Sequence, residues 1–236
     1  MPENAQGLTS RETVGATAAA RAFPSAPMGR TAYVPALRFH ALTGLFDPVM
    51  RLVMRDVQLR RLTLSLLRPE PAERVLDLGC GTGSLAVRLK QEHPRALVVG
   101  YDLDPKALAI AEGKARAAEV SVTWARGPAD DPAFPDQSFD LIVSRYSAHH
   151  WPHPQQALGE FRRLLRPGGT FLLSDIVSYD DFTADTHLQT LEILRDRSHV
   201  RDHTTSAWLA MLAQRGMAGS VVYRWEVWID FVSWVQ

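Results

Sequence analysis

Three glycines at alternate positions, preceded by a carboxylate, form the stretch of this sequence with the clearest chemical meaning. Gly79, Gly81 and Gly83 follow an apolar run that contains Asp77, and a segment with helical spacing begins at Ser84. A strand, a glycine turn and a helix start bring the backbone close to a ligand, because a side chain would block that approach or because φ must be positive. The stretch therefore predicts a ligand site at the end of a buried strand.

A second carboxylate follows the next apolar run. Residues 96–101 predict a buried parallel strand, and Asp102 comes directly after it. A carboxylate at this strand end can accept hydrogen bonds from both hydroxyls of a nucleoside ribose, so we expect Asp102 to bind a ribose. Asp104 and Pro105 instead fit the cap and first turn of the next helix.

Alternating strands and helices fill the middle of the chain. We expect strands over residues 74–78, 96–101, 120–125, 139–144 and 170–175, with helices between them. This alternation predicts an α/β fold with a doubly wound, mostly parallel sheet. A further strand is expected over 216–231, with no turn signal inside it.

Two longer strings carry a family resemblance. The D-x-G-x-G-x-G pattern that begins at Asp77 resembles the first motif of class I S-adenosylmethionine (SAM) methyltransferases, and it differs from the nicotinamide fingerprint G-x-G-x-x-G. Residues 134–144 (FPDQSFDLIVS) and 164–169 (LLRPGG) resemble the ubiquinone/menaquinone-type, or type 11, small-molecule methyltransferases. The resemblance covers residues 33 to about 234 and is specific over 73–175.

The resemblance implies a Rossmann-like class I methyltransferase fold. It also implies SAM as cofactor, S-adenosylhomocysteine as product and a small-molecule acceptor. This class normally closes its sheet with a hairpin of strands six and seven, so we expect the seventh strand to be missing here. The apolar edge strand that this would leave favours aggregation or a homodimer.

The resemblance further implies which residues contact SAM: Asp77, Gly79, Cys80, Gly81, Gly83, Asp102, Leu103, Ala129, Asp130 and Ser144. Leu103 would lie against the adenine. Pro128 stands where the superfamily often has an aspartate that accepts from the adenine amino group, and proline cannot replace it. The amide of Ala129 could still donate to the ring, and Asp130 is either a substitute acceptor or a solvated charge at a helix start.

Family logic places the end of the fourth strand beside the methyl group. Arg145 could pair with a carboxylate of cofactor or substrate, and Tyr146 is expected to contact the substrate. His149 and His150 are candidates for a general base, since imidazole titrates near neutral pH. The alternative is that one of them caps or packs beneath the rim of the sheet. No carboxylate accompanies these histidines and His153 at ligand spacing, so no metal is expected.

The N-terminal part precedes the predicted sheet. Residues 1–30 lack any period and predict a flexible tail. Residues 31–70 predict two helices, the second ended by Arg68-Pro69. The first helix, which carries Tyr33 as a candidate substrate contact, is either a lid or packs on the sheet, and the second more simply packs.

Residues 176–214 form an insertion within the predicted SAM-binding domain of residues 71–236. Its first helix is expected to present an apolar face of Leu188, Leu191, Ile193 and Leu194. The charged stretch that follows resembles a string in the same subfamily, and it is either a substrate lid with His199 and Arg201 facing the pocket or a salt-bridged surface connection. Thr204 or Thr205 then caps a second helix.

The amino-acid composition limits which classes of function the chain can have. Lysine plus arginine equals aspartate plus glutamate at 26 each, so no global charge favours nucleic acid or an anionic membrane. Cys80 is the single cysteine, which excludes an internal disulfide and favours a cytoplasmic setting. Neither a signal peptide nor a membrane span is expected. Two rival functions stay open: a non-catalytic SAM-binding relative, as sensor or structural protein, and a dinucleotide enzyme.

Overall fold

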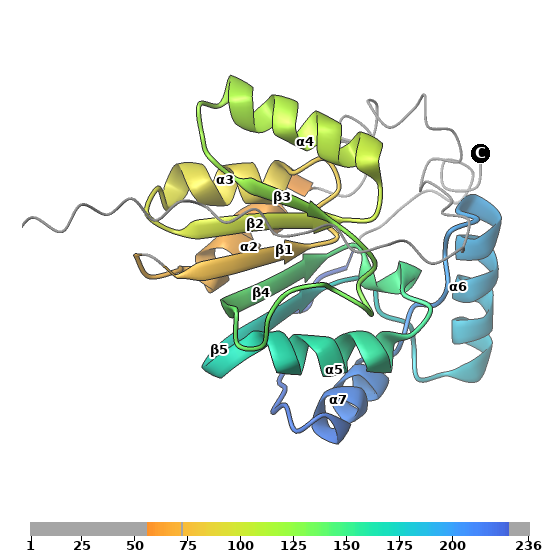
Figure 1. The fold of residues 1–236 in the computed structure, drawn as a ribbon. Coiled ribbons are helices and arrows are strands. Elements are labelled where there is room, and N and C mark those ends of the chain that lie inside the picture. Colours follow the sequence, from red (N-terminus) through yellow and green to blue (C-terminus); the bar gives the residue numbers. More distant parts are fainter. Residues whose placement is uncertain (1–55, 72, 227–236) are drawn as a thin grey trace, which may run out of the picture.

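The computed structural model describes residues 56–71 and 73–226 of the chain (Figure 1). Its sheet has five parallel strands in the order β3-β2-β1-β4-β5. The strands are β1 (Arg74–Leu78), β2 (Leu97–Asp102), β3 (Thr123–Arg126), β4 (Phe139–Arg145) and β5 (Leu165–Ser174). The sheet confirms the expected doubly wound α/β fold.

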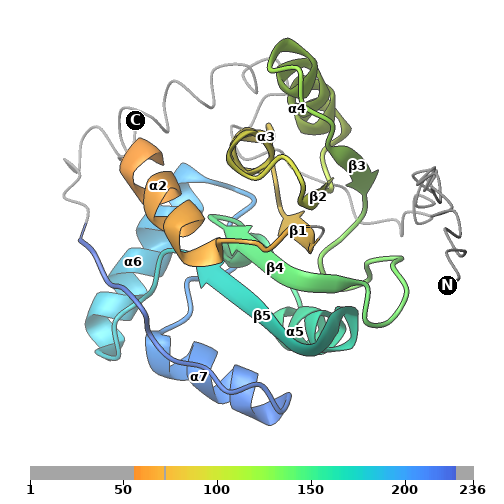
Figure 2. The same cartoon turned by 90° about the vertical axis from the view of Figure 1, so that its left-hand side faces the viewer.

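Helices cover both faces of this sheet (Figures 1 and 2). One face carries α2 (Asp56–Leu67), α3 (Ser84–Glu92) and α4 (Pro105–Ala117), and the other carries α5 (Pro154–Leu164) and α7 (Thr205–Gln214). The sixth helix, α6 (Phe182–Arg195), stands beside the carboxyl ends of the strands in Figure 1. The insertion that contains it therefore lies at the edge where ligands of such sheets bind.

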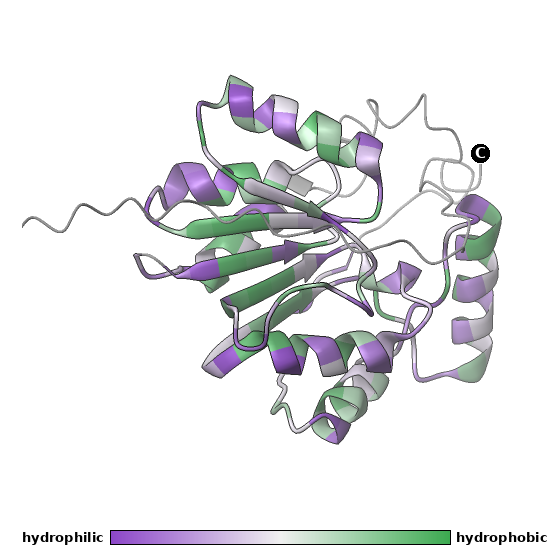
Figure 3. Cartoon of the chain, in the orientation of Figure 1, coloured by the Kyte–Doolittle hydropathy of each residue, from purple (hydrophilic) through white to green (hydrophobic). Residues whose placement is uncertain are grey.

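Two apolar cores separate the layers. Along β1, Leu76 and Leu78 point into the core under α5 and α7, whereas Val75 points into the core under α2 and α3. This alternation is the two-residue period of a strand that is buried on both faces, and Figure 3 shows the central strands coloured as hydrophobic. Asp77 lies on the same side as Val75 and is buried, which makes it an exception in an apolar layer.

The strand order reverses between β1 and β4. Leu78, the last residue of β1, is in register with Tyr101 of β2 on one side and with Ser144 of β4 on the other. The connections from these neighbouring strands leave toward opposite faces, and ligands of such sheets bind at the carboxyl ends of the strands at this point. The glycine-rich turn, residues 79–83, begins at this point.

Most predicted boundaries hold, and Asp104 caps α4 by accepting from the amide of Lys106. The fifth strand begins at Leu165 rather than Thr170, because Leu165 already pairs with Phe139 of β4 before an irregularity in the register. The third strand begins at Thr123 rather than Val120. Glu119 takes a positive φ of 53°, and the amide of Val120 bonds back to Ala115 at the end of α4. These residues close the helix terminus and are therefore not available for pairing with β2.

The prediction of a strand over residues 216–231 is wrong for the part that the structure describes, because residues 217–226 have no strand structure. Gly216 takes a positive φ of 69° at the end of α7, and Gly219 then passes beside Leu209 and Leu212. Arg224 donates to Thr205, at the start of the same helix. The segment thus runs back along α7, so it does not pair with β5.

The apolar face expected for α6 is only half right. Leu188 and Leu191 are half-buried, but Ile193 and Leu194 are 52% and 72% exposed, and the fully buried residues of this helix are Gln189 and Glu192. The side chains that this helix buries completely are therefore polar. The predicted tail, the first N-terminal helix with Tyr33, and residues 227–231 of the last expected strand lie outside the described residues.

Candidate functional site

The three glycines of the turn have different neighbours, although all take a positive φ of 53–74°. A Cβ on Gly79 would lie 2.2 Å from the hydroxyl of Ser147, and one on Gly83 would lie 2.6 Å from Ala111. A Cβ on Gly81 would meet no atom of residues 56–71 and 73–226 within 4 Å. Gly79 and Gly83 therefore allow close packing within the protein, whereas Gly81 borders open space that a ligand could occupy.

Asp102 lies at the glycine-rich turn, where a ribose-binding carboxylate is expected. Its Oδ2 accepts from the amide of Gly81 at 2.7 Å, and its Oδ1 accepts from the amide of Asp104 at 2.8 Å. Burial raises the pKa of this carboxyl, while the two amides work against that shift. Each oxygen keeps a second lone pair, so the amides orient the carboxylate and leave it able to accept from ligand hydroxyls.

Asp77 is a buried carboxylate beside the same turn. It is 2% exposed, and its Oδ2 has no hydrogen-bond partner among the described residues. Burial raises its pKa to about 7, although the nearby positive charge of Arg145 acts in the opposite direction. Such an orphaned oxygen fits a ligand that brings a charged donor, as the α-ammonium group of SAM would. Together with the space at Gly81, it makes these residues a fit for SAM.

The loop after β3 lies beside the end of β2. Gly127 passes so close to Tyr101 that a Cβ would lie 1.9 Å from the phenol oxygen, and that hydroxyl donates to the carbonyl of Pro128 at 3.2 Å. Leu103, Ala129 and Asp130 are half-buried along this loop and the end of β2. Cys80 is half-buried as well, and burial raises the pKa of its thiol, so it is not a thiolate at neutral pH.

A histidine–aspartate pair lies at the end of β4 and β5. His149 Nδ1 is 2.7 Å from Asp175 Oδ1, and the amides of Ser147, Ala148 and Ile176 donate to the same carboxylate. These bonds hold the pKa of Asp175 below its usual value, and the carboxylate raises that of His149 despite burial. Asp175 was not among the predicted site residues, yet it directly follows β5, much as Asp102 ends β2.

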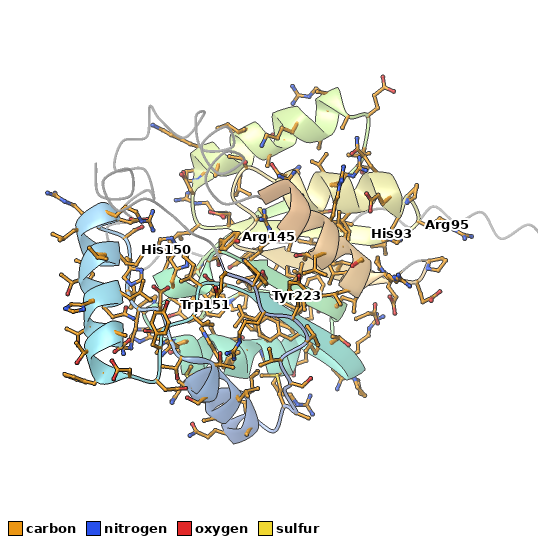
Figure 4. The ribbon with its side chains drawn as sticks, turned by 180° about the vertical axis from the view of Figure 1, so that it is seen from behind. His93, Arg95, Arg145, His150, Trp151 and Tyr223 are labelled. Carbon is orange, nitrogen blue, oxygen red and sulfur yellow. The ribbon has the colours of Figure 1, made fainter. Side chains whose placement is uncertain are left out.

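His150 has a different environment. Its Nδ1 lies 3.1 Å from both the carbonyl and the hydroxyl oxygen of Ser198, and burial followed by the charge of His149 lowers its pKa to about 4. A neutral ring that donates from Nδ1 keeps its other nitrogen as an acceptor. In Figure 4, His150 lies on the α6 side of the sheet edge, while His93 and Arg95 mark the opposite end of the molecule.

Arg145 is the last residue of β4, and Tyr146 follows it. The guanidinium of Arg145 lies 5.3 Å from the centre of the Tyr146 ring. Tyr146 takes a φ of 51°, and its hydroxyl is buried. Burial raises the pKa of this phenol to about 12, so it remains a donor at neutral pH. Ser144, also predicted to contact SAM, is fully buried, with its hydroxyl 3.3 Å from that of Ser147.

The insertion is attached to this site by its backbone. The amides of Val200 and Arg201 donate to the carbonyl of His149, and the His199 ring lies 5.8 Å from the His149 ring. The guanidinium of Arg201 binds Asp185 on α6 at 2.6 Å, and Nε2 of His199 lies 3.1 Å from Gln189. His199 is therefore beside the predicted base, whereas Arg201 is held by α6.

Residues 76–173 match the family model described as "Methyltransferase domain". The chain is 37% identical over 139 residues to the uncharacterized protein YafE of Escherichia coli K12, covering 58% of this chain and 67% of YafE. It is 36% identical over 137 residues to a demethylmenaquinone methyltransferase of Thermus thermophilus, covering 57% of this chain and 62% of that protein. These alignments therefore span about two thirds, or slightly less, of the relatives' lengths.

A solved structure has a similar fold. The crystal structure of the YcgJ protein from Bacillus subtilis superposes with a TM-score of 0.70, at 32% identity, over 75% of each chain. No helix in residues 56–71 and 73–226 combines the length and hydropathy needed to cross a membrane.

Proposed function

The chain belongs to the type 11 family of class I methyltransferases, and on that premise we propose that it transfers a methyl group from SAM to a small-molecule acceptor. The observation that carries this proposal is the meeting of three features at the switch point of the sheet: open space at Gly81, the orphaned oxygen of Asp77 and the carboxylate of Asp102. They match a ligand with an ammonium group and a ribose.

Three groups of this chain would hold the cofactor. Asp102, already oriented by the amides of Gly81 and Asp104, would accept from the ribose hydroxyls. Asp77 would accept from the ammonium group, and the amide of Ala129 is the proposed donor to the adenine. SAM, when bound, supplies a methyl group that is electrophilic because it is carried by a sulfonium. Orientation of the two reactants can then lower the barrier by roughly 7–11 kcal/mol.

The acceptor would lie toward β4, β5 and the insertion. Arg145 and the phenol of Tyr146 are proposed to contact it, one as a cation and the other as a donor. His149 is the better placed candidate for proton removal, because Asp175 binds its Nδ1 and leaves Nε2 as the exchanging atom. His150, with its pKa of about 4, is a weak base and is proposed to position the Ser198 segment.

The relatives suggest which acceptors to test. Their names include demethylmenaquinone methyltransferase and fatty-acid O-methyltransferase, so a reduced naphthoquinone (a naphthohydroquinone) with a free ring position and a long-chain carboxylate are two informative probes. Transfer to the free ring carbon of the hydroquinone, which loses its proton, would indicate carbon methylation, and transfer to the acid would indicate oxygen methylation. Both probes are tested because each combines a large apolar part with one reactive atom.

The test combines binding and transfer. Calorimetry with S-adenosylhomocysteine should detect binding by the wild-type chain, and Asp102→Ala should weaken it by about 1–3 kcal/mol, the scale of hydrogen bonds to a charged acceptor. Asp136→Ala, a surface carboxylate, is the matched control. Labelled SAM with the acceptor probes and with cell extracts then tests turnover. Binding without transfer to any fraction would favour a non-catalytic SAM-binding protein, and NAD binding in its place would favour a dinucleotide enzyme.

A further inference from the structure

The inner face of α6 and the segment that follows it bring three potential metal ligands together. Glu192, His199 and Asp202 each offer a ligand atom, and these atoms all lie within 4.8 Å of one another. All three residues are buried, at 2%, 8% and 1% exposure. We name them the Glu–His–Asp cluster. They explain why α6 turns polar side chains toward the protein.

Hydrogen bonds around Gln189 fix the chemical state of His199. The Gln189 amide nitrogen donates to Asp185 Oδ1 and to the carbonyl of Asp202, so the other atom of this amide is its carbonyl oxygen. That oxygen accepts from the amide of Asp202 and lies 3.1 Å from His199 Nε2. Since a carbonyl oxygen only accepts, Nε2 carries the proton. In the neutral ring, Nδ1 then presents a lone pair.

This lone pair and the Asp202 carboxylate lack any donor within the described part of the chain. His199 Nδ1 and both carboxylate oxygens of Asp202 are buried and make no hydrogen bond, either to each other or to other described residues. Acceptors gathered in a buried space without a donor are unfavourable, because each has lost its water. A cation at their centre would satisfy all of them together.

We propose that Glu192, His199 and Asp202 bind one divalent transition-metal ion, with Zn²⁺ as the best match. One imidazole nitrogen and two carboxylate oxygens form a ligand set that zinc accepts, with a fourth position left for water. Gln189 holds the imidazole by its other nitrogen, as the outer partners of metal-binding histidines do. Arg195 binds the Glu192 carboxylate and orients it in the same way. This proposal replaces the sequence-based expectation that no metal is bound.

The ion would have a structural role. His199 lies beside His149, and the amides of Val200 and Arg201 bond to the His149 carbonyl. A metal that joins α6 to residues 199–202 would therefore fix the insertion against the histidine–aspartate pair. The proposal does not depend on SAM or on methyl transfer.

The test uses the full chain, stripped with a chelator and then loaded. After excess Zn²⁺ is removed by gel filtration, elemental analysis should find one Zn²⁺ per chain, and the melting temperature should rise relative to the stripped protein. Mg²⁺ at the same concentration should not be retained, because it prefers an all-oxygen shell with several waters. Co²⁺ in place of Zn²⁺ should give visible absorption typical of a site with nitrogen and oxygen ligands.

Matched variants assign the ligands. Asp202→Asn and His199→Gln keep side-chain shape and should each weaken Zn²⁺ binding at least about tenfold. Asp181→Asn and His187→Gln change the same residue types elsewhere in the insertion and should retain the metal. Folding of each variant is checked by circular dichroism. Loss of zinc from the wild-type chain on gel filtration, or retention that the ligand variants leave unchanged, overturns the proposal whether or not any variant folds.

Discussion

The glycine-rich turn and the histidine–aspartate pair lie at the same edge of the sheet, but they are held in place by different means. The turn is fixed mainly by main-chain bonds, since the amides of Gly79 and Cys80 both bond to the carbonyl of Tyr101 on the neighbouring strand, while the amide of Gly81 bonds to the Asp102 side chain. The pair depends on a buried side chain, because the carboxylate of Asp175 organises His149 and three backbone amides.

This difference separates two kinds of site construction. A turn built mainly from main-chain bonds needs residues that allow its φ values and its close approaches, so its requirements concern the residue types within the turn. A site built around a buried charge needs partners from distant segments, such as Asp175 and His149, which lie 26 residues apart. The glycine-rich turn should therefore tolerate the loss of a charge better than the histidine–aspartate pair does. The pair should tolerate a small increase in side-chain size better than the turn does.

The largest effect is expected from Asp175→Ala. It leaves His149 and three amides without their acceptor in a buried place, and breaking a buried ion pair in this way costs about 3–5 kcal/mol. The free energy of unfolding, measured with urea, should fall by that amount. Asp136→Ala, which removes an exposed partner of Arg163, should cost no more than about 1 kcal/mol. Equal losses in both variants would mean that Asp175 does not organise the site.

Gly83→Ala should have the next largest effect, now in the glycine-rich turn. Its Cβ would meet Ala111 at 2.6 Å and Trp124 at 2.7 Å while φ is positive, so we expect a loss of about 2–4 kcal/mol in unfolding free energy. Gly81→Ala is the matched control, because it has a similar φ and open space. It should cost about 1 kcal/mol in stability, yet weaken S-adenosylhomocysteine binding. If Gly81→Ala binds normally, the open space is not the cofactor site.

The sequence was informative where structure is local. The strand at residues 74–78, the positive-φ glycines and the cap at Asp104 all follow from short patterns, and the structure confirms them. The proximity of Asp102 to Gly81 could also be predicted, since both follow neighbouring parallel strands. These features depend on backbone geometry that each residue type permits or forbids by itself.

Other features depend on packing partners that no short pattern contains. Ile193 and Leu194 suggested an apolar face, but Gln189 and Glu192 are buried because they meet polar groups of residues 199–202. Likewise, the alternating residues after Gly216 could form a strand only with a partner, and they follow α7 instead. Asp175 could be predicted by the same rule as Asp102, because each carboxylate stands at the carboxyl end of a predicted parallel strand.

Asp77→Asn tests how much the buried carboxylate of Asp77 lowers the free energy of unfolding when no ligand is bound. A pKa raised from 3.8 to about 7 in the fold means that this group favours folding below pH 4, and that this contribution is lost as pH rises toward 7. The full shift corresponds to at most about 4 kcal/mol. Since asparagine is also desolvated there, we expect the ligand-free variant to be about 1–3 kcal/mol more stable at pH 8 and no more stable at pH 4.

Binding should move in the opposite direction in the same variant. The ionised carboxylate is the form that attracts an ammonium group, so wild-type affinity for S-adenosylhomocysteine should improve between pH 6 and pH 8, whereas the Asp77→Asn affinity should be weaker and flat over this range. Urea titrations and calorimetry at the three pH values provide the measurements. A variant that is less stable at pH 8, or that binds as wild type, would contradict the role given to Asp77.

The smallest effect is expected from Arg201→Ala, which asks whether this arginine belongs to the site or only to the surface of the insertion. Its guanidinium binds Asp185, and its side chain is 45% exposed, so we expect no measurable change in melting temperature, as for Arg88→Ala in the exposed pair with Glu92. The acceptor KM decides between the two interpretations. An unchanged KM assigns Arg201 to a surface ion pair, whereas a KM raised in Arg201→Ala and restored in Arg201→Lys would show that the arginine leaves Asp185 to bind substrate.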